Sequence, residues 1–202
     1  KIYGDADPEL TAATRAIEGN SNSGLIGSDA VVYTVSRATG EDAGEYVITA
    51  VGDTTQGNYS VTYVPATFTI AAADGNVVIA DNIAGAEGLT KAYDGLPAAI
   101  EAEAARPGST LLYSLDGVNF TTENPEFYNV GSYDVYVKAT NPNYNDTPIV
   151  RTTLTVNPAA VTVTASNATK VAGAADPAFT ATVSGLVNGE SADLISYTVS
   201  RA

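Results

Sequence analysis

The sequence predicts an all-β chain, and three observations support that fold class. Runs of β-branched and aromatic residues, such as 31–35 and 67–70, are bounded by glycine, proline, asparagine and aspartate, which is typical of strands joined by turns. Residues 40–48 read Gly-Glu-Asp-Ala-Gly-Glu-Tyr-Val-Ile, a tight turn that leads into an alternating apolar run. A similar turn and run occur at residues 131–137. We therefore predict β-sheets built from repeated units.

The turn at residues 40–46 is typical of the corner that precedes a late strand in an immunoglobulin-like sandwich. In such a corner the tyrosine ring packs into the core and its hydroxyl donates to the backbone of the turn. Gly44 and Tyr46 hold these positions in the first copy, and Gly131 and Tyr133 hold them in the second. Two copies of the corner predict two copies of the sandwich, with these four residues in structural roles.

Matching positions recur along the chain at nearly constant spacing. Tyr133 follows Tyr46 by 87 positions, and residues 197–202 repeat residues 33–38 without a change, 164 positions later. A recurring period of this length indicates tandem repeats. We predict immunoglobulin-like sandwiches arranged end to end, in three units: residues 1–72, which lack a first strand; residues 73–157; and residues 158–202, the N-terminal part of a third unit.

The strands of the first unit are expected in chain order. Residues 1–8 begin as a strand and run into a turn, while residues 11–30, which include three glycines, read as a short strand and loops. Residues 31–35 form a strand, and the corner follows it. Alternating residues at 59–63 and the run at 67–70 complete the unit before a linker at 71–75.

The second and third units follow the same plan. Residues 77–79 open the second unit, and residues 111–120 form a hairpin whose tip, Asp116-Gly117, favours a primed two-residue turn. Residues 153–156 close that unit. Residues 161–164 open the third, which stops before its corner, so each incomplete unit is expected to present an unpaired sheet edge.

Composition excludes several classes of function. The 202 residues include no Cys, His, Trp or Met, so a disulfide framework, a thiolate metal site and a histidine base are absent. The formal net charge of −14 argues against nucleic acid as a partner, because phosphate binding requires a basic surface. The sequence has no run of 18 apolar residues, so no membrane insertion is predicted. It has no initiator Met and no leader, which suggests an internal or mature piece.

Four acidic residues are candidate calcium ligands. Asp5, Asp7, Glu41 and Asp42 are expected to gather near one junction between domains. Calcium takes six to eight oxygen ligands, and loop carboxylates supply them. The alternative is that these residues cap backbone N–H groups within the turns. Because the spacing matches no complete calcium loop, no resident cofactor is expected.

A lysine recurs at an equivalent position in each unit, as Lys1, Lys91 and Lys170. A buried lysine has a lowered pKa and becomes a nucleophile, so Lys91 is a candidate for a covalent crosslink to Asn157, with Glu101 or Glu103 as the neighbouring acid. The alternative is a surface lysine whose aliphatic stem lies along the sheet.

The twelve tyrosines offer few binding candidates. Those with repeat partners alternate with apolar positions and read as core. Tyr136 falls on the outward face of its strand, where it is either an exposed binding residue or a cross-strand packing residue. No nucleophile elbow, phosphate loop or zinc motif is present, so we predict no catalytic residues and no enzyme activity.

Several motifs resemble a known family. Lys-Ile-Tyr-Gly-Asp-Ala-Asp-Pro at residues 1–8, the segment 37–46 and Asn58-Tyr59 resemble the mostly bacterial Ig-like (MBG) repeats of bacterial surface proteins. The middle unit, with Lys-Ala-Tyr-Asp-Gly at residues 91–95, is similar to the related repeats with a Tyr-Asp-Gly motif. The resemblance implies secreted, cell-wall-attached or fibrous proteins, in which such repeats are spacers or adhesive modules without catalytic residues.

The sequence therefore predicts an extracellular structural segment: a stalk, spacer or fibre subunit of a bacterial cell-surface or secreted protein. Its expected partners are neighbouring repeats or copies of itself. In the second case, residues 161–169 complete the first unit of another copy by strand addition. Such a head-to-tail contact builds a filament when it does not close into a ring. The alternative is an adhesin-like module that binds a glycan or host protein through its loops or an exposed sheet face.

Overall fold

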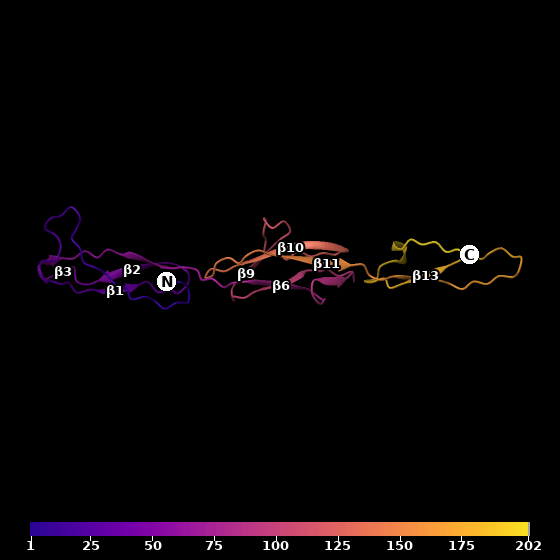
Figure 1. Cartoon of the computed structure of the whole chain (residues 1–202), viewed down its shortest axis with the longest axis horizontal. Helices are drawn as coiled ribbons and strands as arrows, with labels where there is room; N and C mark the ends of the chain where they lie inside the picture. The colour runs from indigo at the N-terminus through magenta and orange to yellow at the C-terminus, as the bar shows by residue number, and fades with distance from the viewer. Residues whose placement is uncertain (202) are drawn as a thin grey trace. The chain divides into compact units, whose positions relative to one another are not determined.

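The computed structural model describes residues 1–201 and confirms the all-β class (Figure 1). Its only helical element within those residues is a short 3₁₀ turn, η1 (Ala192–Leu194). The strands are β1 (Thr34–Arg37), β2 (Gly44–Val51), β3 (Thr55–Gln56), β4 (Tyr59–Ser60), β5 (Ala66–Ile70), β6 (Val78–Ile83), β7 (Thr90–Ala92), β8 (Ile100–Ala104), β9 (Thr110–Ser114), β10 (Gly131–Thr140), β11 (Val150–Asn157), β12 (Thr162–Ala165) and β13 (Ala181–Ser184).

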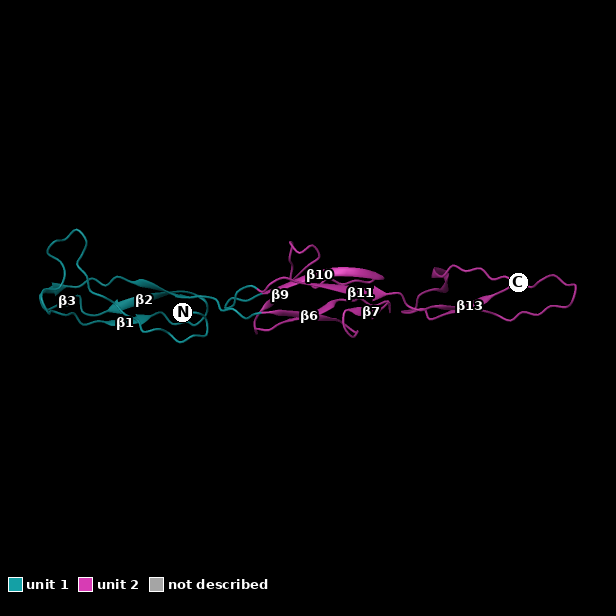
Figure 2. Cartoon of the chain, viewed as in Figure 1, with its two compact units in different colours: residues 1–76, 140–146 teal, residues 77–139, 147–202 magenta. Residues whose placement is uncertain are grey.

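The chain forms two compact units, coloured separately in Figure 2. Unit 1 comprises residues 1–76 together with residues 140–146, and unit 2 comprises residues 77–139 and 147–201. Within residues 1–201, no helix combines the length and the hydrophobicity that a membrane span requires. The boundaries at residues 72 and 157 that the repeats suggest stay predictions.

Unit 1 is built on an antiparallel sheet of order β1-β2-β5. Along β2, Tyr46, Ile48 and Ala50 are half-buried while the residues between them are exposed, so the alternation in the sequence is the alternation of the two sheet faces. The N-terminal residues extend this sheet, because Ile2 pairs in parallel with Ala71 just after β5. Phe68 and Ile70 of β5 are the buried apolar side chains of this unit.

The first strand of that sheet starts later than predicted. Residues 31–35 were expected to be extended in a ladder, but β1 begins at Thr34. The reason is Gln56, whose carboxamide accepts from the Val32 N–H at 2.7 Å and donates to the Val32 carbonyl at 2.7 Å. A side chain therefore satisfies the backbone of Val32, in place of a neighbouring strand.

Unit 2 contains a two-layer sandwich. One layer is the sheet β7-β11-β10-β9, in which β7 runs parallel to β11, and the other is the antiparallel pair β6-β8. Alternate residues of each layer face the other and form one core. Its fully buried members include Ile83, Ile100, Val135, Val137 and Leu154.

The predicted primed turn at Asp116-Gly117 is wrong. Tyr113 and Thr121 form the last antiparallel bridge of the hairpin, so the loop is longer than two residues. The Asp116 carboxylate accepts from the backbone N–H groups of Val118 and Asn119, both at 2.8 Å, and these bonds hold the longer loop and lower the pKa of Asp116.

The last part of unit 2 contains β12 paired antiparallel with β13. The side chains of β12 are exposed, and those of β13 alternate between half-buried and exposed. Ser191 caps η1 by accepting from the Asp193 N–H.

Candidate functional site

The motif residues of unit 1 form a cluster of ion pairs. Asp7 lies between two cations: its Oδ1 is 2.6 Å from Lys1 Nζ, and its Oδ2 is 2.6 Å from Arg37 Nε. Glu41 also contacts both cations. The side chains of Lys1 and Arg37 are 4% and 8% exposed, so the two cations are buried beneath carboxylates that face solvent.

Arg37 is the centre of this cluster. All five N–H donors of its guanidinium are used. Nε and Nη2 donate to the Asp7 carboxylate, and Nη2 also donates to Glu41. Nη1 donates to the carbonyls of Ala38 and Gly40. Its guanidinium carbon lies 5.4 Å from the ring centroid of Tyr46 and 5.0 Å from that of Phe68. Arg37 thereby joins the motif loop and the corner to the buried side of the sheet.

The pairing shifts the protonation of every member of the cluster. The hydrogen bond from Arg37, followed by that from Lys1, lowers the pKa of Asp7 to about 2. Lys1, and then Arg37, lowers the pKa of Glu41. The pKa values of Lys1 and Arg37 are raised, mainly by Asp7. All four groups are therefore held in their charged forms at neutral pH.

Part of this cluster recurs near the end of the chain, in residues 170–201. Lys170 Nζ pairs with Asp176 Oδ1, and Arg201 Nε lies 2.9 Å from Asp176 Oδ2. Lys1 Nζ also donates to the carbonyl of Asp5, as Lys170 Nζ does to that of Ala174, four residues on in each case. Because both copies have the same bonds, we infer that the lysine and the aspartate of the motif hold together the loop between them.

The calcium candidates do not converge on a shared centre. Asp7 and Glu41 are engaged by Lys1 and Arg37, and Asp42 Oδ1 accepts from the side chain of Asn143. Within residues 1–201, no three acidic, His or Cys side chains gather in a way that would hold a metal ion. The carboxylates that have bonds here neutralise cations and orient an amide, so their role differs from the capping of backbone N–H groups that the sequence left open.

Both tyrosine corners make the hydrogen bond that the pattern predicts. The Tyr46 hydroxyl donates to the Asp42 carbonyl at 2.8 Å, and the Tyr133 hydroxyl donates to the Asn129 carbonyl at 2.9 Å. A Cβ atom added to Gly131 would lie 2.9 Å from the Tyr133 hydroxyl, whereas one added to Gly44 would meet open space. Gly131 is thus required by its contact with the tyrosine ring, whereas at Gly44 the constraint is the backbone, whose φ is +158°.

A contact that the sequence did not predict involves Asn143. Its Oδ1 accepts from the Ala43 N–H at 2.7 Å, and its Nδ2 donates to Asp42 Oδ1 at 2.8 Å, so one carboxamide spans the corner of unit 1. Beside it the Tyr144 ring stands edge-on to Tyr3, with centroids 5.5 Å apart. These contacts place residues 140–146 in unit 1, although their neighbours in sequence belong to unit 2.

Residues 73–74 complete this contact. The chain at Ala73 pairs in parallel with Tyr144, with hydrogen bonds of 2.9 Å from the Ala73 N–H to the Asn143 carbonyl and from the Asn145 N–H to the Ala73 carbonyl. Asn145 Nδ2 donates to Asp74 Oδ1 at 2.7 Å. The linker therefore has a sheet partner.

The structure does not bring the crosslink candidates together. Lys91 is opposite Val156 in the β7–β11 ladder and is buried, whereas the next residue of β11, Asn157, is exposed, so the two side chains lie on opposite faces. Lys91 Nζ instead pairs with Asp94 at 3.1 Å and donates to the Pro97 carbonyl. Glu101 and Glu103 are exposed on β8.

Tyr136 lies on the outer face of β10 and is half-buried. A Cβ atom added to Gly117 would lie 3.3 Å from its ring, so the hairpin loop packs over it. It has the packing role that the sequence gave as one of two alternatives.

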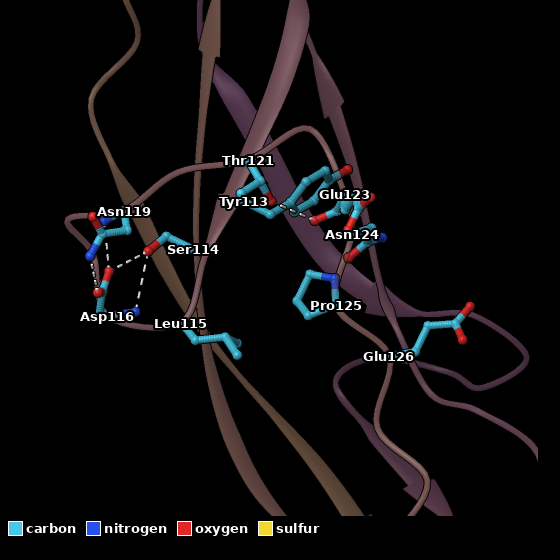
Figure 3. A pocket seen from close by; sticks show the side chains of 10 residues that line it. All are labelled: Tyr113, Ser114, Leu115, Asp116, Asn119, Thr121, Glu123, Asn124, Pro125 and Glu126. Carbon is cyan, nitrogen blue, oxygen red and sulfur yellow. Dashed lines mark hydrogen bonds between the residues drawn. The ribbon is translucent and has the colours of Figure 1, made fainter.

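Unit 2 has an open cleft of about 860 Å³ beside the hairpin loop (Figure 3). One wall is the loop from Ser114 to Asn119, and the other is the segment from Glu123 to Glu126. Tyr113 lies between the walls and is only 8% exposed. No pattern in the sequence pointed to this cleft, although all of its lining residues lie within residues 113–126.

Comparison with known proteins gives one family and a distant structural likeness. The family described as "MBG domain (YGX type)" matches residues 1–69 and 161–202. No curated protein matches the chain. Among solved structures, "Drosophila OTK, extracellular domains 3-5" is similar with 14% identity and a TM-score of 0.27, over 57% of this chain and 39% of that chain.

Proposed function

The chain belongs to the MBG domain (YGX type) family of Ig-like repeats, which are typical of bacterial surface proteins, and we propose that it is an extracellular spacer segment of such a protein. In this role the repeats have no catalytic activity. They hold other parts of the surface protein away from the cell, as a stalk or as part of a fibre, and their partners are neighbouring repeats.

The observation that supports this proposal best is the bond of Asn143 to the corner of unit 1. A spacer resists bending when its connecting segments are bonded into a folded unit, because free linkers permit independent motion. The carboxamide of Asn143 makes two hydrogen bonds to Asp42 and Ala43, and Ala73 adds main-chain bonds to the same loop. Such contacts suit a mechanical role.

The motif residues support the same reading. In an active site or a ligand site, charged groups are left available for a substrate. Here Lys1, Arg37 and Asp7 are bonded to one another, and Lys170, Asp176 and Arg201 repeat the arrangement. The residues that define the family thus serve to close loops.

The spacer proposal is tested by small-angle X-ray scattering of the full chain and of two asparagine variants. Asn143→Ala removes both bonds to the corner and is expected to broaden the distribution of interatomic distances. Asn58→Ala is the matched control, because Asn58 holds the equivalent place 85 positions earlier and makes no side-chain hydrogen bond within residues 1–201. If the native chain has a distribution of interatomic distances as broad as that of Asn143→Ala, the proposal is contradicted.

A second candidate function is assembly by strand addition. Tyr197 donates to the Ala181 carbonyl of β13, and Tyr33 donates to the Ala12 carbonyl in the same way, so residues 12–15 correspond to β13. β13 is paired with β12, whereas residues 12–15 have no strand partner within residues 1–201. A strand from an earlier part of the same polypeptide or from a second copy fits there. Light scattering separates the two sources, because only the second raises the mass with concentration.

A further inference from the structure

We propose that the Tyr-Asp-Gly motif at residues 93–95 is a docking site for an Asn-Gly turn of the neighbouring repeat, and that the turn at residues 187–190 is its occupant in this chain. Both segments belong to unit 2, and two side-chain hydrogen bonds join them. The inference rests on the spacer function and deepens it, because it names a surface through which one repeat contacts the next. The bonds of Asn143 lie in unit 1, so the two proposals are tested independently.

The motif is fixed on the sandwich of unit 2. It follows β7, and the Tyr93 N–H donates to the carbonyl of Asn157 at the end of β11, at 2.8 Å. The Tyr93 ring packs against the buried core of this unit. Asp94 closes the loop of the motif, since its Oδ1 accepts from the Leu96 N–H at 3.0 Å. The Tyr93 hydroxyl and the Gly95 carbonyl are therefore held in place for a partner.

The occupant is a turn of defined shape. Asn188 and Gly189 have φ values of 52° and 72°, and the Glu190 N–H donates to the Val187 carbonyl at 3.1 Å. Positive φ at both central residues is the mark of a type I′ turn, for which Asn-Gly is a preferred sequence. Within residues 1–201, Asn188 is the only residue other than glycine with a positive φ. This uncommon conformation requires a reason, and the contact with the motif supplies one.

Two hydrogen bonds join the turn to the motif. The Tyr93 hydroxyl donates to Glu190 Oε1 at 2.6 Å, and Asn188 Nδ2 donates to the Gly95 carbonyl at 3.0 Å. A hydrogen bond to an ionised carboxylate is stronger than one between neutral groups. Tyr93 and Glu190 are both half-buried, so water competes less for this bond than it would on an open surface.

Gly95 makes the contact selective. Its φ is +76°, and a Cβ atom there would lie 2.4 Å from the Asn188 Cβ atom. The motif and the turn therefore approach each other more closely than any side chain at this position permits. The three residues of the motif thus have three roles: Tyr93 donates to the turn, Asp94 closes the loop, and Gly95 leaves room for the asparagine.

Unit 1 contains a related contact. Tyr3 holds the place of Tyr93 in the first copy of the motif, and its ring stands edge-on to Tyr144, with centroids 5.5 Å apart. In both units, the tyrosine of the motif thus contacts a loop from later in the chain. The loops differ in chemistry, because unit 1 uses an aromatic ring where unit 2 uses the carboxylate of Glu190. Each motif is therefore matched to its own partner loop.

The experiment is NMR of the full chain in a weakly aligning medium, where residual dipolar couplings report the orientation of each part. The couplings of strands β6–β11 and those of residues 158–201 are expected to fit one alignment tensor. Gly95→Ala should abolish the shared tensor, because the added methyl group overlaps Asn188. Gly85→Ala is the matched control: its φ is also +76°, but a Cβ atom there meets nothing within 4 Å, so the shared tensor should remain.

Two milder variants each remove one of the bonds and keep the fold. Asn188→Gly retains a residue that suits positive φ and removes the carboxamide, and Tyr93→Phe retains the ring that packs on the core. Each variant should shift the amide signals of residues 187–190 part of the way towards those of Gly95→Ala.

Three results would overturn the proposal. The first is separate tensors for the two parts of the native chain. The second is equal couplings in Gly95→Ala and Gly85→Ala, or amide signals of residues 187–190 that Asn188→Gly leaves in place. The third is a set of shifts at residues 93–95 that grow with protein concentration, since the turn would then come from a second copy. Separate tensors together with a native distance distribution narrower than that of Asn143→Ala would reject this docking site and retain the spacer function.

Discussion

At the scale of single residues, the family motif is explained by one arginine. Arg37 has five donors in a fixed planar arrangement, and five acceptors from two loops surround it. Asp7 receives two of those donors and the ammonium of Lys1 as well. The aspartate of the motif is thus the counter-ion that allows two cations to be buried, a condition on which the loop depends.

A pH dependence of unit 1 follows from Asp7. Its pKa in the folded protein is about 2, below the ordinary value of about 3.9. A lowered pKa stabilises the fold above the ordinary value, and this stabilisation is lost as the pH falls from about 4 to about 2. We therefore expect the thermal midpoint of unit 1, followed by the NMR signals of Tyr46 and Phe68, to fall across that interval.

Asp7→Asn should lower the midpoint at pH 7 and flatten its decline below pH 4. The matched control is Asp5→Asn in the same turn, because the Asp5 side chain makes no hydrogen bond or ion pair within residues 1–201. Asp5→Asn should keep the native profile. Parallel profiles for the native chain and Asp7→Asn would show that the ion pairs to Asp7 do not stabilise the fold.

At the scale of the elements, the corner depends on a glycine outside its core motif. Gly40 has a φ of +140°, and a Cβ atom there would lie 2.3 Å from the Tyr46 ring. Gly40 also supplies a carbonyl to Arg37 at 2.6 Å. The corner, the ring and the ion-pair cluster therefore meet at one backbone position, where only glycine fits.

Gly40→Ala is expected to destabilise unit 1 by about 2–5 kcal/mol, the sum of overpacking against Tyr46 and a strained backbone. Gly4→Ala is the matched control: its φ is +90°, but a Cβ atom there meets nothing within 4 Å, so only the backbone cost of about 1 kcal/mol applies. Urea unfolding of both variants provides the measurement. A Gly40→Ala chain no less stable than Gly4→Ala would show that the loop moves freely away from the ring.

The sequence predicted those elements whose signal is local. The corners at Tyr46 and Tyr133 were visible because the turn, the tyrosine and the alternating strand are adjacent in the chain. Gln56 was not recognised, since its effect is on Val32, 24 positions earlier, where its carboxamide replaces a strand. The hairpin was recognised but its loop was not, because the Asp116 side chain competes with the backbone for the N–H groups that would close a tight turn.

The candidate site shows the same division. The acidic motif residues were identified, but their partner Arg37 was not, although the recurrence of residues 33–38 at 197–202 carried that signal. Both copies contain the arginine and the aspartate, as Arg37 with Asp7 and Arg201 with Asp176, and this joint recurrence indicates an ion pair. Asn143 had no such signal, because it bonds to a corner 100 positions earlier in the chain, which only the fold brings beside it.

At the scale of the whole molecule, the two compact units differ in how much of a sandwich each has around its core. The sandwich of unit 2 has two layers and many fully buried side chains, whereas unit 1 has the sheet β1-β2-β5, the short pair β3-β4, and Phe68 and Ile70 as its buried apolar side chains. Ile17, Ile26 and Val32 of unit 1 are 57%, 76% and 79% exposed. We expect a further strand to cover these side chains.

A strand placed before Lys1 should provide that cover. In the third repeat, β12 precedes Lys170 and pairs with β13, and residues 12–15 are the counterpart of β13 in unit 1. Fusing a copy of residues 158–169 to Lys1 is therefore expected to raise the unfolding midpoint of unit 1 and to protect the amides of residues 12–15 from hydrogen exchange.

The matched control is the same fusion with proline in place of Val163, because proline cannot donate to a ladder and excludes the added segment from a sheet. If the fusion with the native segment and the proline fusion have equal midpoints and equal exchange, residues 12–15 do not accept a strand and the exposed apolar residues require a different cover. If the native segment alone protects them, any concentration-dependent association of the unfused chain should disappear in the fusion, because the edge that a second copy would occupy is already filled.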